Sequence, residues 1–370
     1  MKRLALIAVL AAAAALPAAA PGAACSPLSC AASGVSVGNG YLAARPSGAY
    51  GIAQVVDLRT GETKWSLPQG MLVGHTLVEQ SQTNPQKLIW HDALTGKPTG
   101  TATIRAAGPF SLVGLSQDGS RAVLVNSTKQ ESTFVIVSRS NEQIVKFPTQ
   151  KWAFDALRGN KLYLLRYLKN GYEIRLYDLA AGRLAAKPLK DPNGSSRIWG
   201  IAWERVSSPD GRYVFTLYVG GDGGAMVHQL DLKTSAARCI DLPGSRDFNS
   251  ATTWAMELSP NGKTLWAVSP TFGRVVGIDV AQKKVRVAFG FKKTSFAAGD
   301  TGAATSVSAM SPDGAHMAVG TGGKIFYVSM AHRVVVQGVP HSAIALGYAP
   351  DGTTLWVVDK AEQVTALPAL

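Results

Sequence analysis

The sequence predicts an all-β fold built from one repeated four-stranded unit, and three observations support this prediction. Residues 258–290 divide into three short strands and two turns, with β-branched and aromatic residues in the strands. The same succession of turn and hairpin recurs along the chain at intervals of 35 to 53 residues. No segment outside the Ala-rich N-terminal leader has a sustained helical period.

The first recurring marker is a tight turn between two apolar runs. In these turns Gly supplies a positive φ, Pro presets φ, and Asp or Asn bonds back to the turn backbone. Residues 158–161 form a degenerate copy of the turn. The regular copies end at Gly119, Gly211, Gly262, Gly314 and Gly352.

The second marker ends one strand and opens a hairpin to the next. Its seven copies begin at Asp57, Asp92, Ser138, Asp178, Asp231, Asp279 and Ser329. Asp359 resembles an eighth copy, but it follows the preceding turn too closely to end a third strand. We therefore expect Asp359 to end a second strand.

A four-stranded antiparallel sheet cannot bury both of its faces alone. Packing such sheets face to face around an axis buries them and leaves only short edges, which predicts a β-propeller. Seven hairpins favour seven four-stranded blades, closed by joining N-terminal and C-terminal strands in one blade. Residues 41–67 and 342–370 together supply more strand than one blade needs, so eight blades remain an alternative. The expected domain spans residues 41–370.

Residues 34–370 resemble the WD40 and YVTN-type β-propeller repeat families. The similarity is greatest in residues 258–290, and the Ser-Pro-Asp-Gly turns at 208–211 and 311–314 fit the wider class. The chain departs from both patterns, since no Trp-Asp blade ending is present and residues 266–269 (WAVS) replace the YVTN tetrapeptide. The resemblance implies a fold and no single activity.

Residues 1–24 have the pattern of a signal peptide. A basic start at Lys2 and Arg3 precedes an apolar run from Leu4 to Leu16, and small residues follow up to residue 24. We therefore expect a secreted or extracytoplasmic protein. No later apolar run is long enough for a transmembrane helix.

The chain contains three cysteines. Cys25 and Cys30 lie in a predicted linker, residues 25–40, and are close enough to pair after export. Cys25 also stands where a lipoprotein anchor would, but Gly22 replaces the aliphatic residue expected at −3, so plain secretion is favoured. Cys239 is expected to be a buried thiol.

The composition excludes an intrinsically disordered chain, because 46% of the residues are hydrophobic and 16% are charged. The formal net charge is +13. It supports weak attraction to anionic surfaces, but the basic residues are scattered, so no specific nucleic-acid binding is predicted.

Three long loops lead into predicted innermost strands and carry polar residues. Loops hold functional residues more often than frameworks do, although tolerated insertions are an equally simple explanation. We refer to the ligand-binding candidates in these loops as the rim residues: Asp191, Asn193, Arg197, Trp199, Arg246, Asp247, Lys292 and Lys293.

A second set of candidates lies in or just before the predicted innermost strands. These side chains would either line a central channel, where an aromatic group stacks on a ligand, or pack and pair between blades. We refer to them as the channel residues: Trp152, Trp203, Glu204, Arg205, Trp254 and Glu257.

No catalytic residue, metal ligand or cofactor site is predicted. Residues 34–38 match GxSxG, but they lie in the predicted linker without the strand, turn and helix of a nucleophile elbow. The six histidines lack metal-binding spacing. The Gly-rich residues 220–224 lack the helix N-terminus of a phosphate cradle.

The leading hypothesis is a secreted, non-enzymatic propeller that presents its rim and channel to a protein, a glycan or a small ligand. The alternative is a propeller enzyme, similar to lactonases or lyases in architecture only, with histidines and acids from different blades converging at the channel mouth. A third hypothesis is a structural module of a cell-envelope assembly.

Overall fold

The structure is a computed structural model that describes most of the chain after residue 33. The described residues are 34–38, 41–44, 53–67, 70–81, 83, 85–128, 130–168, 171–191, 200–219, 224–243, 253–291, 306–321, 323–359, 361 and 363–369. These residues form strands and turns, and none of them is helical. The expected signal peptide, Cys25 and Cys30 lie outside the described part.

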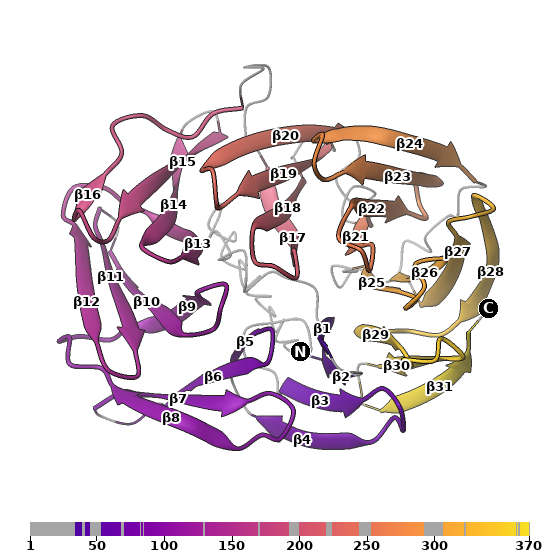
Figure 1. The fold of residues 1–370 in the computed structure, drawn as a ribbon, viewed down its shortest axis with the longest axis horizontal. Coiled ribbons are helices and arrows are strands. Elements are labelled where there is room, and N and C mark those ends of the chain that lie inside the picture. Colours follow the sequence, from indigo (N-terminus) through magenta and orange to yellow (C-terminus); the bar gives the residue numbers. More distant parts are fainter. Residues whose placement is uncertain are drawn as a thin grey trace, which may run out of the picture.

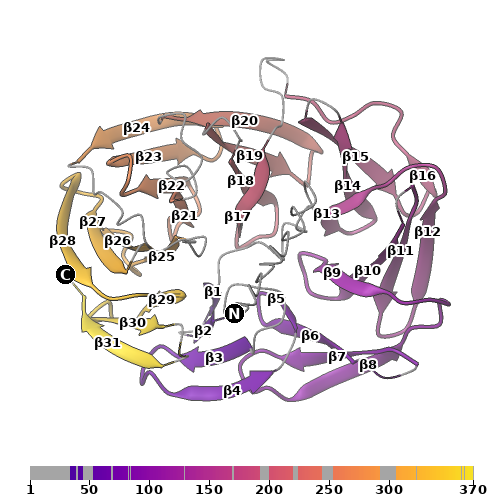
Figure 2. The same cartoon turned by 180° about the vertical axis from the view of Figure 1, so that it is seen from behind.

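The strands form eight antiparallel sheets arranged as a ring, as both views show (Figures 1 and 2). Seven sheets have four strands and the last has three. Within each sheet the strands pair in sequence order, and the first strand lies nearest the centre of the ring. The predicted all-β propeller class is confirmed.

The first four sheets occupy the N-terminal half of the chain. Their strands are β1 (Gly34–Gly38), β2 (Tyr41–Ala44), β3 (Ala53–Asp57), β4 (Thr63–Leu67), β5 (Met71–Val73), β6 (Thr76–Gln80), β7 (Lys87–Asp92), β8 (Pro98–Thr103), β9 (Ser111–Leu115), β10 (Arg121–Ser127), β11 (Ser132–Ser138), β12 (Glu142–Phe147), β13 (Ala153–Arg158), β14 (Lys161–Leu168), β15 (Gly171–Asp178) and β16 (Arg183–Leu184).

The other four sheets follow in the same order. Their strands are β17 (Ile201–Ser207), β18 (Tyr213–Val219), β19 (Ala225–Asp231), β20 (Ala236–Leu242), β21 (Ala255–Leu258), β22 (Thr264–Ser269), β23 (Arg274–Asp279), β24 (Lys284–Gly290), β25 (Val307–Met310), β26 (His316–Thr321), β27 (Lys324–Ser329), β28 (Val334–Pro340), β29 (Ala345–Tyr348), β30 (Thr354–Val358) and β31 (Val364–Pro368).

The predicted turns close with local hydrogen bonds. Ser208 Oγ donates to Asp210 Oδ1 over 2.6 Å, and the Gly211 N–H donates to the Ser208 carbonyl over 2.8 Å. Gly211 has a φ of 61°, which is why Gly is needed there. Equivalent bonds form in the turns at 116–119, 259–262 and 311–314.

The hydrophobic core lies between neighbouring sheets. Phe215 and Leu217 of β18 pack against Met256, Leu265 and Ile278 of the following sheet, and other clusters join other neighbours in the same way. Each sheet thus buries both faces by contact with its two neighbours, as the repeat predicted.

The way the ring closes differs from the leading expectation. Among the described residues, no strand of the first sheet is paired with a strand of the last by backbone hydrogen bonds, and β29 packs beside β1 and β2 instead. Seven blades with one shared blade are therefore not confirmed, and the eight sheets correspond to the alternative. Asp359 follows β30, so it ends a second strand, as predicted.

The first sheet also begins earlier than expected. β1, residues 34–38, pairs with β2, so residues assigned to the linker contribute an innermost strand. The GxSxG match lies on this strand. No helix in the described part of the chain has the length and apolar character to cross a membrane.

Candidate functional site

The ring has two faces, which we name by the connections that lie on them. On the loop face, the sheet-to-sheet loops lead into the innermost strands and the second strand turns into the third. On the turn face lie the tight turns between first and second strands and the hairpins between third and fourth strands. Antiparallel order places these connections at opposite ends of every sheet.

Of the rim residues, Asp191 alone belongs to the described part of the chain. Its side chain is 3% exposed and accepts hydrogen bonds from Arg238 Nη1 and from the Cys239 N–H, each over 2.9 Å. Asp191 therefore fastens the segment before β17 to strand β20. The other rim residues lie outside the described residues: Asn193, Arg197, Trp199, Arg246, Asp247, Lys292 and Lys293.

The channel tryptophans lie between sheets. Trp152 is 1% exposed and Trp254 is fully buried. Each packs into an inter-sheet cluster, with Phe154 and with Met256 respectively. Trp203 is partly buried and sits at a bulge, where β17 has one residue more than its partner strand. This placement matches packing between blades.

Arg205 forms a buried ion pair with Asp155. Asp155 was not among the residues predicted from the sequence. The two innermost strands β13 and β17 carry these residues in neighbouring sheets. Asp155 occupies a bulge in β13, and its side chain is 2% exposed, against 6% for Arg205. Arg205 donates to the Asp155 carboxylate, to the Asp155 carbonyl and to Thr216 Oγ1.

Two further polar side chains, Tyr218 and His228, lie near this ion pair. Both are 2% exposed or less, and their rings meet edge to face at 6.2 Å. Burial, with a contribution from Arg205, lowers the pKa of His228 to about 4. His228 is therefore neutral at physiological pH and packs as a structural histidine inside the sheet interface.

The acidic channel residues Glu204 and Glu257 belong to neighbouring innermost strands. The Met256 N–H donates to Glu204 Oε2 over 2.8 Å, and Ser308 Oγ donates to Glu257 Oε1 over 3.3 Å. Burial raises the pKa of Glu257 to about 8, and burial together with the nearby Glu257 raises the pKa of Glu204 well above its ordinary value. The pair ties three sheets together through their inner strands.

We expect the Glu257→Gln variant to gain stability relative to the wild-type protein as pH rises. Because the pKa of Glu257 is higher in the folded than in the unfolded protein, protonation of Glu257 stabilises the fold. This contribution is complete below the unfolded pKa of about 4.5 and is lost as the pH rises through about 8. Glu257 keeps some exposed surface, so we expect a difference of about 1–2 kcal/mol between pH 4 and pH 8. Urea unfolding of both proteins at the two pH values measures it. Parallel pH profiles would contradict the prediction.

A cavity of about 820 Å³ opens on the turn face across three neighbouring sheets, β9–β12, β13–β16 and β17–β20. Three acids and three bases contribute to its lining: Asp118, Arg158, Lys161, Asp178, Asp210 and Lys233. We refer to it as the turn-face cavity. It lies on the opposite face from the rim residues, because the lining comes from the tight turns and the third-to-fourth hairpins.

The acids of the turn-face cavity are held by their own turns. Asp210 accepts from Ser208 Oγ and from the Arg212 N–H, and these bonds lower its pKa. Asp178 accepts from two backbone N–H groups over 2.9 and 3.0 Å. The turns thus fix the acids of the cavity, and basic side chains share its lining.

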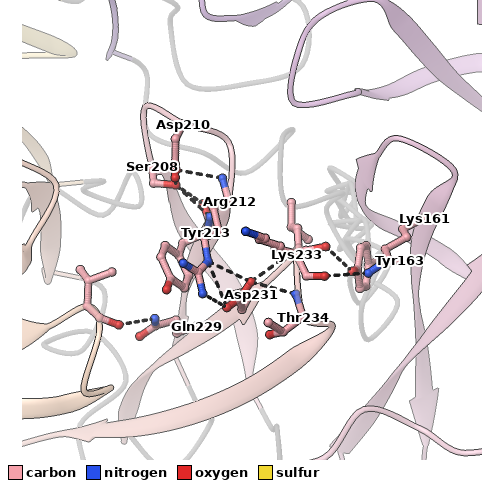
Figure 3. A network of polar contacts seen from close by, with 12 residues as sticks. Lys161, Tyr163, Ser208, Asp210, Arg212, Tyr213, Gln229, Asp231, Lys233 and Thr234 are labelled. Atoms are coloured by element: carbon pink, nitrogen blue, oxygen red, sulfur yellow. Dashed lines mark hydrogen bonds and ion pairs between the residues drawn. The ribbon is translucent and has the colours of Figure 1, made fainter.

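A polar network lies beside the turn-face cavity, and its members Lys161, Asp210 and Lys233 also line the cavity (Figure 3). Lys161 Nζ donates to the Lys233 carbonyl over 2.8 Å, and Tyr163 Oη donates to the Leu232 carbonyl over 3.0 Å. Arg212 pairs with the buried Asp231 over 2.8 Å. Although burial acts in the opposite direction, bonds from Arg212 and from backbone N–H groups lower the pKa of Asp231 to about 2. These bonds hold the lining residues Lys161 and Lys233 in a connected framework.

Comparison with known proteins supports the fold. The dihydro-heme d1 dehydrogenase NirN aligns with a TM-score of 0.50 and 15% identity, covering 90% of this chain and 74% of that one. The Myceliophteria thermophila Cps50 (Swd1) β-propeller domain aligns at 0.47 with 12% identity, covering 90% and 93%. Citrobacter koseri AztD aligns at 0.43 with 12% identity, covering 78% and 92%. No family model and no curated protein matches the chain, so the WD40 and YVTN resemblance stays a prediction.

Proposed function

We propose that this chain is an exported, non-catalytic β-propeller that binds a polar small molecule, glycan or protein segment in the turn-face cavity. The signal-like residues 1–24 support export. The cavity carries the proposal, because its volume of about 820 Å³ lies in the range of small-molecule sites and it spans three sheets whose turns are already fixed.

The lining of the turn-face cavity supports binding better than catalysis. The carboxylates of Asp118 and Asp210 have lowered pKa values and accept bonds from their own turns, so neither is suited to proton transfer at neutral pH. The charges of both signs fit a polar ligand with its own hydrogen-bond donors and acceptors. In the described part of the chain, no three His, Cys, Asp or Glu side chains are grouped to hold a metal ion.

The rim residues remain a second proposed binding region, on the loop face, whereas the channel residues pack or pair between sheets and are not part of it. Asp191 fixes the segment at the base of the rim, and the buried inner strands give the loops a rigid support. A ligand that spans a long loop surface, such as a protein partner, would suit this face.

A screen of polar ligands tests the turn-face cavity. We expect at least one sugar, amino acid or dicarboxylate from a thermal-shift panel to raise the Tm of the mature protein, without being converted. The Lys233→Glu change reverses a charge at the exposed cavity edge and should weaken that ligand at least tenfold, a loss of about 1.4 kcal/mol.

Lys284→Glu provides the matched control, because Lys284 is an exposed lysine on the outer strand β24, away from the cavity. Equal weakening by both changes would show nonspecific charge attraction, and undiminished binding by Lys233→Glu would place the site elsewhere.

Mass spectrometry of the exported protein checks the cleavage after residue 22 or 24.

One observation favours the enzyme alternative. Glu257, on an innermost strand, has a pKa raised to about 8 by burial, which is suited to a general acid at neutral pH. Turnover of a lactone or polysaccharide by the wild-type protein that is lost in Glu257→Gln would favour this alternative over the binding function.

A further inference from the structure

A cluster of two arginines and one glutamate lies at the loop-face end of the sheet β13–β16. Arg166 and Glu173 are directly paired across strands β14 and β15. Arg166 Nη2 lies 2.6 Å from Glu173 Oε1, and Arg175 Nε lies 3.2 Å from the same oxygen. The three side chains are only 26%, 11% and 22% exposed, in the order Arg166, Glu173 and Arg175.

Both guanidinium groups rest on one tryptophan. The central carbons of Arg166 and Arg175 lie 5.1 and 6.0 Å from the centre of the Trp152 ring. Ser132 holds Trp152 in place. The Ser132 hydroxyl donates to the Trp152 carbonyl over 2.9 Å and accepts from the Trp152 N–H over 3.0 Å. Cation–π attraction to a fixed ring keeps the two cations side by side.

The cluster has more donors and more positive charge than Glu173 can balance. Each guanidinium has five N–H donors, whereas a single carboxylate bridges the two groups. The covered Nε of Arg166 has no hydrogen-bond acceptor among the described residues. An excess charge of +1 in a half-buried setting favours an added anion, because two adjacent guanidinium groups match the oxygens of phosphate, sulfate or carboxylate.

The cluster is reachable from solvent. Strand β14 continues past Arg166 to Leu168, whose side chain lies on the same face of the sheet and is 48% exposed. A ligand with an anionic group and an apolar part could contact the two arginines and Leu168, which share this face of the sheet.

We propose that Arg166 and Arg175, held on Trp152, form a binding site for the oxyanion group of a ligand on the loop face. This site lies at the opposite end of its sheet from the turn-face cavity. Its existence is therefore independent of the function proposed for that cavity.

Titration of the mature protein with inorganic phosphate and with sulfate, at constant ionic strength set with chloride, tests the site. We expect saturable binding in calorimetry and a matching rise in Tm. Arg166→Gln should weaken binding at least tenfold. Glu173→Gln should strengthen it several-fold, since it removes the competing carboxylate and raises the excess charge to +2. If the cluster served only to stabilise the fold, Arg166→Gln and Glu173→Gln would not change anion binding in opposite directions.

Arg286→Gln is the matched control, because Arg286 is also paired with an acid, Asp279, but is 52% exposed on an outer strand. It should leave binding unchanged. The proposal is overturned if the wild-type protein shows no saturable binding, if Arg166→Gln binds as the wild-type does, or if Glu173→Gln binds more weakly. Arg175→Lys, which keeps the charge but loses the planar fork, should bind more weakly even if Arg166→Gln does not fold.

Discussion

The Asp155→Ala variant should be destabilised by about 3–5 kcal/mol relative to the wild-type protein. The change removes the carboxylate that compensates Arg205, whose side chain is 6% exposed and lies between two sheets. A buried guanidinium without a counter-charge is costly because the sheet interface offers little solvent to replace the lost bond. The urea midpoint of unfolding, followed by tryptophan fluorescence, measures the loss.

Two comparisons separate this effect from ordinary truncation. The double variant Asp155→Ala/Arg205→Met removes both charges and should be more stable than Asp155→Ala alone. Arg286→Ala breaks the exposed pair with Asp279 and should cost about 0–1 kcal/mol. If Asp155→Ala costs no more than Arg286→Ala, the buried pair does not stabilise the interface as we infer.

The turns and hairpins were predictable because their determinants are local. Ser208, Asp210 and Gly211 bond to one another within four residues, and the other partners of this turn, Arg212 and Tyr213, follow directly. Asp92 likewise accepts the N–H groups of Leu94 and Thr95, in its own hairpin. Such bonds form whatever surrounds the segment, so their sequence pattern predicts them directly.

The closure of the ring was not predictable in the same way. Residues 34–38 carry neither of the recurring markers, and β1 is recognised only by its pairing with β2. Whether the first and last sheets share strands or simply pack together depends on contacts between segments far apart in the chain. Counting hairpins therefore gave the repeat but not the number of sheets.

The candidate sites were likewise predictable only where a single segment of the sequence reveals them. Arg205 and Glu204 stood out because charged residues are unexpected in innermost strands. Asp155 did not, because its role depends on a bulge and on a partner in the next sheet. The turn-face cavity arises where turns from three sheets meet, so no single segment encodes it. The sequence also predicted a site on the loop face, which is the opposite face of the ring.

The contact that joins the ends of the chain can be tested at Trp356. Its Nε1 donates to the Leu58 carbonyl over 2.5 Å, and its ring covers Gly61, where it leaves no room for a side chain. Trp356 also packs on the cluster that joins Val56 and Leu58 to Ile344 and its neighbours. It is therefore a principal link between the first and last sheets among the described residues.

Trp356→Ala should cost about 3 kcal/mol and loosen the two sheets that close the ring. Trp266→Ala is the matched control, because Trp266 occupies the same Thr-Leu-Trp position in an internal sheet and covers Gly277 of the adjacent strand β23. Under limited proteolysis, Trp356→Ala should be cleaved first within the first and last sheets, whereas Trp266→Ala should not expose them preferentially. The same cleavage pattern in both variants would mean that the ring is not held at this seam, and that the eight sheets unfold together whichever interface is weakened.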